Sequence, residues 1–223
     1  MPDPHPLQKR YPLFESIART AHVDAARFEE MSRRAGEDPE GFWGEVGKRI
    51  DWIKPYSRVK DVSFVLDDLH IRWYDDGTLN VCANCVDRHL DTRGDQTAIL
   101  WEGDDPDRDA KITYRELYER VCRFANVLKR LGVGKGDRVT LYLPMIPEAA
   151  VAMLACARIG AVHSVVFGGF SPDALVGRIV DCDSRIVVTA DTGLRGGRST
   201  GLKTHRSPTD AGIEFGAFGL AGV

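Results

Sequence analysis

The sequence lacks the long hydrophobic runs and the excess of one charge that mark membrane and nucleic-acid-binding proteins. Its longest uninterrupted apolar run covers residues 149–157, well short of the ~18 apolar residues that suggest a membrane span. Lys and Arg number 30 against 33 Asp and Glu, which gives a formal net charge of -3. Such a balanced chain offers no basic field. We therefore expect neither nucleic acid nor a membrane among its partners.

Cysteine is also sparse, and its five copies lie mostly inside apolar segments, as reduced thiols do in cytosolic proteins. Cys82 and Cys85 have a spacing seen in zinc and redox sites, but only His89 lies near them and a fourth ligand is missing. An ordinary structural role is therefore favoured over a metal site. Residues 1–6 carry three prolines and no apolar stretch, unlike a secretory signal. We expect a cytoplasmic protein without a bound metal.

The N-terminal part of the chain is predicted to be a helical pair followed by β-structure. With 43% apolar and 28% charged residues, the chain has the composition of a globular protein. Asp24 and Asp38 are helix caps, and Pro39 is typical of a first helical position. Apolar runs at 70–74 and 79–81 flank Asp76-Gly77, a pattern that predicts a β-hairpin at this turn.

The middle of the chain carries a helix signal with a clear beginning. Residues 96–102 and 111–113 are predicted strands separated by a polar turn. Thr113 and Glu116 then have the spacing of a capping box, in which each side chain satisfies an amide of the other residue. A helix is expected to begin there and to end near Gly132.

The next segment predicts the fold class, because strands and helices alternate in it. The order βαβαβ indicates parallel strands with right-handed crossovers and helices on the sheet. We therefore expect an α/β protein, in which the N-terminal helical pair and β-hairpin precede a partial doubly wound parallel sheet. The expected strands and helices cover residues 138–143, 147–159, 162–167, 172–182 and 185–190.

Ligands of such sheets collect beyond the carboxyl ends of the strands, which here are residues 144–146, 168–171 and 191–198. Gly168 and Gly169 would let a ligand approach the backbone closely, although a simple tight turn explains them equally well. Arg195 and Arg198 flank Gly196-Gly197. Two guanidinium groups beside a flexible turn suit a phosphate, but charges near turns are more often simply solvated.

Two common kinds of site are not supported by the sequence. The glycine-rich segment 132–136 follows a predicted helix and precedes a strand, which is the reverse of a dinucleotide fingerprint, and no Walker A sequence occurs. His70, His89 and His163 are scattered and lie in no nucleophile-elbow context. Structural roles are favoured for these histidines.

Several motifs resemble the N-terminal region of AMP-forming acetyl-coenzyme A synthetases, which are members of the adenylate-forming enzymes. Residues 160–170 are similar to a motif of the short-chain acyl branch, and residues 112–117 to the first core motif of the superfamily. Similar segments from the N-terminal region are residues 42–45, 50–52, 72–74, 80–81 and 84–90. The resemblance implies a tail (1–22), an acetyl-CoA synthetase-type N-terminal region (23–90) and the N-terminal portion of an incomplete AMP-binding domain (91–198). Residues 199–223 are unmatched, and their small, polar and glycine-rich composition without a sustained period predicts a disordered tail.

The resemblance implies an acetate–CoA ligase, in which acetate and ATP give acetyl-AMP and CoA then attacks it. It places Phe167, Gly168 and Gly169 along the pantetheine arm of CoA. It places Arg195, Gly196, Gly197 and Arg198 at the phosphate-bearing nucleotide end. The family's ATP and Mg²⁺ contacts and its catalytic lysine lie beyond the matched segments. ATP and Mg²⁺ are thus expected only in the complete enzyme, and no catalytic residue is named.

The resemblance fades after Arg198, and Thr192 already stands where the family usually has Glu. We therefore expect an inactive N-terminal fragment, with a gene fragment or frameshift as the hypothesis for its tail. The alternatives are a non-catalytic remnant that binds a CoA-like ligand weakly, a propionate-type synthetase fragment, or an interaction module, for which no positive signal exists. An uncovered sheet edge would also allow self-association.

Overall fold

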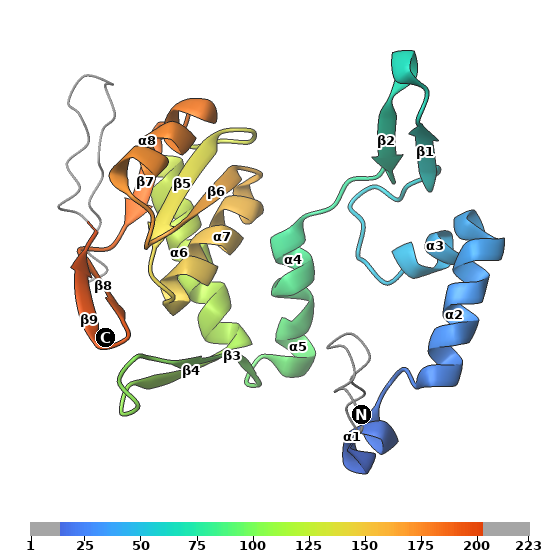
Figure 1. The fold of residues 1–223 in the computed structure, drawn as a ribbon, viewed down its shortest axis with the longest axis horizontal. Helices are drawn as coiled ribbons and strands as arrows, with labels where there is room; N and C mark the ends of the chain where they lie inside the picture. Colours follow the sequence, from blue (N-terminus) through green and yellow to red (C-terminus); the bar gives the residue numbers. More distant parts are fainter. Residues whose placement is uncertain (1–13, 203–223) are drawn as a thin grey trace, which may run out of the picture. The chain divides into compact units, whose positions relative to one another are not determined.

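The computed structural model describes residues 14–202, and Figure 1 shows their ribbon. The chain divides into two units, one ending at Thr78 and one beginning at Leu79. Each unit is described by itself. Among the described helices, none is long and apolar enough to cross a membrane.

The first unit begins with the expected helical pair, preceded by one short helix. Its helices are α1 (Glu15–Thr20), α2 (Ala25–Glu37) and α3 (Pro39–Gly47). The Asp24 carboxylate accepts a hydrogen bond from the Arg27 amide, and the Asp38 carboxylate accepts one from the Gly41 amide. Both predicted caps are therefore confirmed, because each satisfies an amide that the first helical turn leaves free.

The hairpin of this unit joins residues 60–63 to 70–73, and not residues 70–74 to 79–81 as the sequence predicts. Strands β1 (Lys60–Ser63) and β2 (His70–Trp73) pair antiparallel, and the short 3₁₀ helix η2 (Leu66–Asp68) connects them. The expected hairpin at Asp76-Gly77 is wrong, since residues 79–81 form no strand. Helix α4 (Val81–Cys85) begins there instead.

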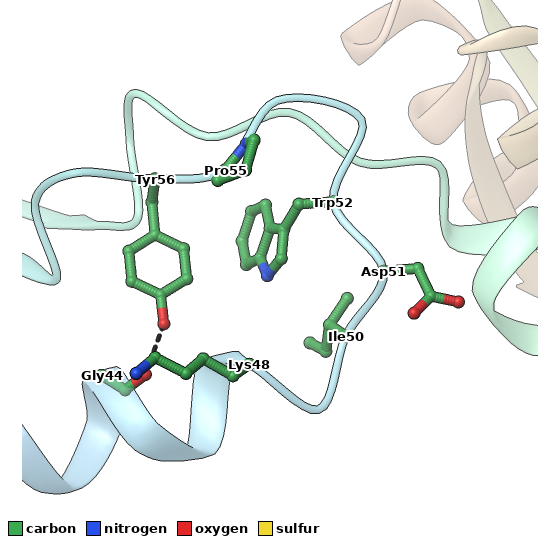
Figure 2. A pocket seen from close by; sticks show the side chains of 7 residues that line it. All are labelled: Gly44, Lys48, Ile50, Asp51, Trp52, Pro55 and Tyr56. Carbon is green, nitrogen blue, oxygen red and sulfur yellow. Dashed lines mark hydrogen bonds between the residues drawn. The ribbon is translucent and has the colours of Figure 1, made fainter.

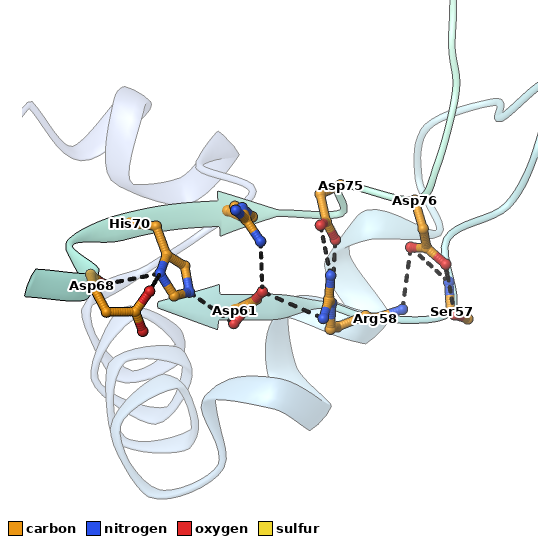
Figure 3. A network of polar contacts seen from close by, with 8 residues as sticks. Ser57, Arg58, Asp61, Asp68, His70, Asp75 and Asp76 are labelled. Carbon is orange, nitrogen blue, oxygen red and sulfur yellow. Dashed lines mark hydrogen bonds and ion pairs between the residues drawn. The ribbon is translucent and has the colours of Figure 1, made fainter. Parts of the chain in front are cut away.

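Asp76 explains this error, because its carboxylate has other partners. It accepts hydrogen bonds from the Ser57 amide at 2.9 Å and from the Ser57 hydroxyl at 2.6 Å (Figure 3). These bonds lower the pKa of Asp76 to about 2. Because Ser57 lies 19 residues earlier, these bonds join two distant segments of the chain. The Asp-Gly turn therefore fastens the chain to residue 57 and starts no hairpin.

The second unit opens with short helices, an antiparallel strand pair and a long helix. The capping box at the start of α6 is confirmed: the Thr113 hydroxyl accepts from the Glu116 amide at 3.2 Å, and the Glu116 carboxylate accepts from the Thr113 amide at 2.8 Å. The elements are α4, η3 (Asp87–His89), α5 (Leu90–Arg93), β3 (Thr97–Glu102), β4 (Asp109–Thr113) and α6 (Tyr114–Arg130).

A parallel three-stranded sheet follows, as predicted, in the order β6-β5-β7. Figure 1 shows β5 between the other two strands. The chain passes from β5 to β6 on one side and returns to β7 on the other, so the sheet is doubly wound. Its elements are β5 (Arg138–Leu143), α7 (Pro147–Ile159), β6 (Val162–Phe167), α8 (Pro172–Asp181) and β7 (Ile186–Thr189).

Both faces of β5 are buried, against different partners. Leu141 belongs to a core with residues of α6 and α7, whereas its neighbour Tyr142 belongs to a second core with residues of α8. Successive strand residues point to opposite faces, so the two helical layers cover opposite faces of the sheet. At the edge strand β6, Val165 remains 55% exposed.

The region after the sheet is the main departure from the sequence prediction. Strands β8 (Thr192–Arg195) and β9 (Arg198–Gly201) form an antiparallel hairpin, and Leu202 is buried. The prediction of a disordered tail from residue 199 is therefore wrong for residues 199–202, because a Gly-Gly turn pairs them with β8. Residues 203–223, the rest of that tail, and residues 1–13 lie outside the described residues.

Candidate functional site

The candidate site lies at the carboxyl edge of the parallel sheet. The chain leaves β5 at Leu143, β6 at Phe167 and β7 at Thr189. The chain continues from β5 to β6 on one side of β5 and then to β7 on its other side, so the strand order reverses at β5. Ligands of open α/β sheets bind at such a reversal, outside the carboxyl ends of the strands. The loops after these three strands therefore form the candidate site.

The loop after β6 is a tight turn braced from beneath. The Phe170 amide donates to the Phe167 carbonyl at 3.0 Å. The Tyr142 hydroxyl lies 3.3 Å from the Gly168 carbonyl oxygen and 3.2 Å from that of Phe170. Tyr142 is 2% exposed, and burial raises its pKa, which keeps the phenol protonated as a donor. This brace is a feature that the sequence analysis missed.

Position 168 favours glycine because the backbone of Leu143 lies close to it, and not because of an unusual φ. A Cβ atom at this position would lie 3.3 Å from the Leu143 carbonyl oxygen, tighter than an ordinary contact. Its φ is not among the positive values of the described glycines. The glycine thus lets β6 pass close to the end of β5. This geometry agrees with the tight-turn interpretation.

Two aromatic side chains stand beside this turn. The rings of Phe167 and Phe170 meet edge to face, with centroids 5.9 Å apart. They are 44% and 40% exposed. The Arg178 guanidinium lies 5.2 Å from the centre of the Phe170 ring, within cation–π range. The turn therefore offers an apolar wall next to an accessible backbone.

The hairpin after β7 packs with its base on the same strand end. A Cβ atom on Gly193 would lie 3.3 Å from the Pro144 Cβ atom, and the Leu202 amide donates to the Asp191 carbonyl at 3.0 Å. Gly168 contacts Leu143 and Gly193 contacts Pro144, so the two candidate loops flank one dipeptide. The structure thus brings the glycine turn and the hairpin base together.

The arginines lie at the far end of this hairpin. Arg195 and Arg198 are a cross-strand pair, and Gly196 and Gly197 between them have φ of +56° and +72°, values that favour glycine. Four strand residues at 3.3 Å each carry the tip about 13 Å from the base. Arg198 is exposed and forms no ion pair with another described residue. The side chain of Arg195 is outside the described part of the structure.

The turn between β3 and β4 holds the tip of the hairpin. The Gly197 amide donates to the Asp104 carboxylate at 2.9 Å. Nearby, the Trp101 indole N–H donates to the Met145 carbonyl at 2.7 Å, which ties β3 to the loop after β5. Neither contact is predictable from a local sequence pattern, since each joins segments far apart in the chain. The candidate site is therefore framed by three loops and by this fourth turn.

Two depressions in the described residues lie away from this edge. One of about 540 Å³ belongs to the first unit (Figure 2). There the Trp52 indole donates to the Gly47 carbonyl at 2.9 Å and the Tyr56 hydroxyl donates to the Gly44 carbonyl at 2.5 Å, so both rings cap the end of α3. A second, of about 240 Å³, lies near Arg138 at the amino end of β5. Neither contains a predicted site residue.

The two buried cysteines, Cys82 and Cys156, are unsuited to nucleophilic or metal chemistry at neutral pH. All five are free thiols. Burial raises the pKa of Cys82 and of Cys156 to about 11, which disfavours the thiolate that a zinc ion or an attacking sulfur needs. The described residues contain no group of three or more His, Cys, Asp or Glu side chains that could hold a metal ion.

Two family models match the chain. The family described as AMP-binding enzyme matches residues 86–213, more than half of the chain. The chain belongs to this family. Residues 28–85 match the family described as acetyl-coenzyme A synthetase N-terminus. The AMP-binding match extends beyond residue 198, where the resemblance was expected to fade.

The relatives of this chain are considerably longer than it is. It is 64% identical over 196 residues to an acetyl-coenzyme A synthetase of Novosphingobium aromaticivorans, a match that covers 87% of the chain and 30% of that protein. It is 60% identical over 212 residues to one of Rhizobium rhizogenes, covering 95% of the chain and 32% of the relative. The chain therefore spans about a third of the length of these relatives.

A solved structure shows the same fold. The acetoacetyl-CoA synthetase of Streptomyces lividans has a TM-score of 0.70 and 30% sequence identity, over 78% of this chain and 26% of that one. The expected fold, a partial N-terminal domain of an adenylate-forming synthetase, is thereby confirmed.

Proposed function

We propose that this chain supplies the CoA-binding edge of an acetate–CoA ligase. That reaction converts acetate, ATP and CoA into acetyl-CoA, AMP and pyrophosphate through acetyl-AMP. The observation that carries the proposal is the convergence of the Gly168 turn and the β8–β9 hairpin on Leu143 and Pro144. The high identity to acetyl-coenzyme A synthetases supports acetate as the acyl substrate. The two matched segments support a boundary near residue 90 between an N-terminal region and the AMP-binding domain.

In this proposal the two loops bind different ends of CoA. Phe167, Gly168 and Gly169 line the path of the pantetheine arm, because the turn combines accessible backbone with an apolar wall. Residues 195–198 bind the phosphate-bearing nucleotide end, since a guanidinium offers several donors to a phosphate. The roughly 13 Å between the hairpin base and its tip suits an extended ligand.

Activation of acetate needs groups that we do not find in the printed sequence. Positioning of ATP and compensation of its phosphate charge commonly involve Mg²⁺, a glycine-rich cradle and a lysine. We therefore propose that residues 1–223 alone form no acetyl-AMP, and that ATP and Mg²⁺ act only in the complete enzyme. Acetate-dependent exchange of labelled pyrophosphate into ATP is the assay, and turnover above a mock preparation would contradict this.

The role of the arginines is testable in a chimera. Residues 14–202 would replace the matching segment of the Novosphingobium relative, and Arg195→Ala with Arg198→Ala would be introduced together. The KM for CoA is expected to rise about tenfold or more, because each charge-assisted contact contributes about 1.5 to 3 kcal/mol and less where exposed. Pyrophosphate exchange, which needs no CoA, is expected to stay nearly unchanged.

A matched control removes two positive charges from the other edge of the sheet. Lys129 and Arg130 lie in the last turn of α6, which leads to the amino end of β5. Their double alanine variant is expected to leave the KM for CoA within about twofold, apart from a small loss of stability at the helix end. A pyrophosphate exchange rate that falls as far as the full reaction in the Arg195/Arg198 variant would refute the CoA assignment.

A further inference from the structure

A carboxylate of the protein itself, that of Asp104, is bound at the tip of the β8–β9 hairpin. The Gly197 amide donates to the Asp104 carboxylate at 2.9 Å, across 93 residues of sequence. Both glycines of the tip have positive φ, as in the two-residue turns that favour glycine in hairpins, and the Gly197 amide faces the carboxylate. The contact therefore marks this amide as a donor suited to an oxyanion.

The two loops that meet here also carry complementary charges. The β3–β4 turn contains Asp104, Asp105, Asp107 and Arg108 and is therefore acidic on balance, and the tip contains Arg195 and Arg198. Opposite charges at the ends of two loops favour their approach, most strongly at low ionic strength. Because a phosphate would be drawn by the same arginines, it would meet the Asp104 carboxylate at the same place.

We propose that Asp104 is an internal competitor of the ligand phosphate. In the ligand-free protein its carboxylate occupies the Gly197 amide, and a bound phosphate monoester takes that donor in its place. This inference rests on the proposed function, which brings the phosphate-bearing end of CoA to the tip. Asp104 thereby sets the affinity for the phosphate without taking part in the reaction.

The competition follows from the chemistry of the donor. One N–H serves one strong acceptor well, and two anions beside each other repel, so carboxylate and phosphate exchange rather than share the site. Asp104→Asn keeps an oxygen that can accept from Gly197 but removes the charge. Asp104→Ala removes the acceptor as well. The pair of variants therefore separates repulsion of the ligand from positioning of the hairpin.

The test follows the Gly197 amide resonance in the ¹⁵N-labelled 223-residue chain during titration with CoA and, separately, with inorganic phosphate. Asp104→Asn is expected to lower the half-saturating concentration of both by about threefold to tenfold, with a smaller gain at high salt. Asp107→Asn is the control: it removes the same charge from the same turn, and its side chain makes no hydrogen bond to the hairpin among the described residues. It is expected to change the half-saturation by less than twofold.

Three results would overturn the inference, and they are distinguishable. If the Gly197 amide resonance gives the same half-saturating concentration of CoA in the wild type and in Asp104→Asn, Asp104 does not compete and the proposed function stands. If both Asp104→Asn and Asp104→Ala weaken CoA binding, Asp104 positions the hairpin and does not oppose the ligand. If neither probe shifts Gly197 in any variant, the phosphate site at the tip fails, and the competition fails with it.

Discussion

Single side chains fasten the candidate site in ways that a local pattern does not reveal. Tyr142 reaches the Gly168 and Phe170 carbonyls from the adjacent strand, and Asp104 reaches Gly197 from a turn 93 residues away. The caps at Asp24, Asp38 and Thr113 were predictable because cap and amide lie within three residues. A tyrosine inside an apolar strand does signal a hydroxyl that needs a partner, but the sequence cannot name that partner.

The Tyr142 hydroxyl is expected to stabilise the unit that contains the sheet. Tyr142→Phe leaves two backbone carbonyls without this donor and should lower the free energy of unfolding by about 1 kcal/mol. Urea denaturation measures the change. Tyr114→Phe is the control, since the Tyr114 ring packs on His89 while its hydroxyl has no hydrogen bond to another described residue. Equal losses in both variants would contradict the role of the brace.

His70 makes the β1–β2 hairpin sensitive to pH. Its Nε2 lies 3.0 Å from the Asp61 carboxylate and its Nδ1 lies 3.0 Å from the Asp68 carbonyl (Figure 3). The hydrogen bond to Asp61 is the main cause that raises the pKa of His70 above its usual value of about 6.5. Because the folded-state pKa is raised, the stabilisation is complete below about pH 6.5 and is lost as the pH rises through the raised value.

An NMR titration of the His70 ring protons is expected to give a pKa above 6.5. Asp61→Asn should bring it back toward that value, although Arg58 and Arg72, which also contact Asp61, lose a partner in the same variant. Arg58 remains paired with Asp75. A His70 pKa that is unchanged by Asp61→Asn would show that the contact does not form in solution.

Among the elements, the regular βαβαβ segment and the strands of the β3–β4 pair were predictable, whereas the connection of the β1–β2 hairpin and the β8–β9 hairpin were not. The parallel strands lie where continuous apolar runs predicted them, because burial on both faces leaves few polar residues in the pattern. The Asp76-Gly77 turn was misread, since its acid bonds to residue 57 and not within a ladder. The β8–β9 hairpin was missed although a Gly-Gly pair between two short runs is a known hairpin signal. Arg195 and Arg198 at its turn instead favour the interpretation of a ligand-binding loop.

Two glycines with open surroundings are expected to respond oppositely to alanine. Gly196 at the hairpin tip has φ of +56°, whereas Gly177 lies in helix α8, and a Cβ atom would meet nothing within 4 Å at either position. Gly196→Ala should weaken the hairpin by about 1 kcal/mol, seen as about fivefold faster hydrogen exchange of the β8–β9 amides. Gly177→Ala should instead raise the free energy of unfolding by about 0.5 to 1 kcal/mol. Two changes of the same sign would contradict this reasoning.

The edge strand β6 is the expected route of self-association. It pairs with a neighbour on one side only among the described strands, and it carries Val162, Val165 and Phe167 exposed and no charged Lys, Arg, Asp or Glu. Exposed apolar edges favour pairing with another chain. Concentration-dependent sedimentation of the 223-residue chain should therefore be suppressed by Val165→Lys. Val180→Lys, which adds the same charge on α8 at a 66% exposed position, should not suppress it.

In the whole molecule, the proposed function requires that the Gly168 turn and the β8–β9 hairpin bind one ligand, CoA. The sequence predicted the sheet edge and named both loops, because carboxyl ends of parallel strands meet at one edge. It could not predict that the hairpin base packs on Pro144 or that its tip is held from another turn, since both depend on the tertiary fold. The family match and the shared fold support the ligase assignment for a chain about a third as long as its relatives.

The most direct test of the account compares the binding of CoA and of 3′-dephospho-CoA to the 223-residue chain by titration calorimetry. We expect saturable binding of CoA, about tenfold weaker binding of the dephosphorylated form, and no difference between the two in the Arg195→Ala/Arg198→Ala variant. Equal affinity of the wild-type chain for both ligands, or no binding of either, would contradict a CoA site at the edge formed by the Gly168 turn and the β8–β9 hairpin.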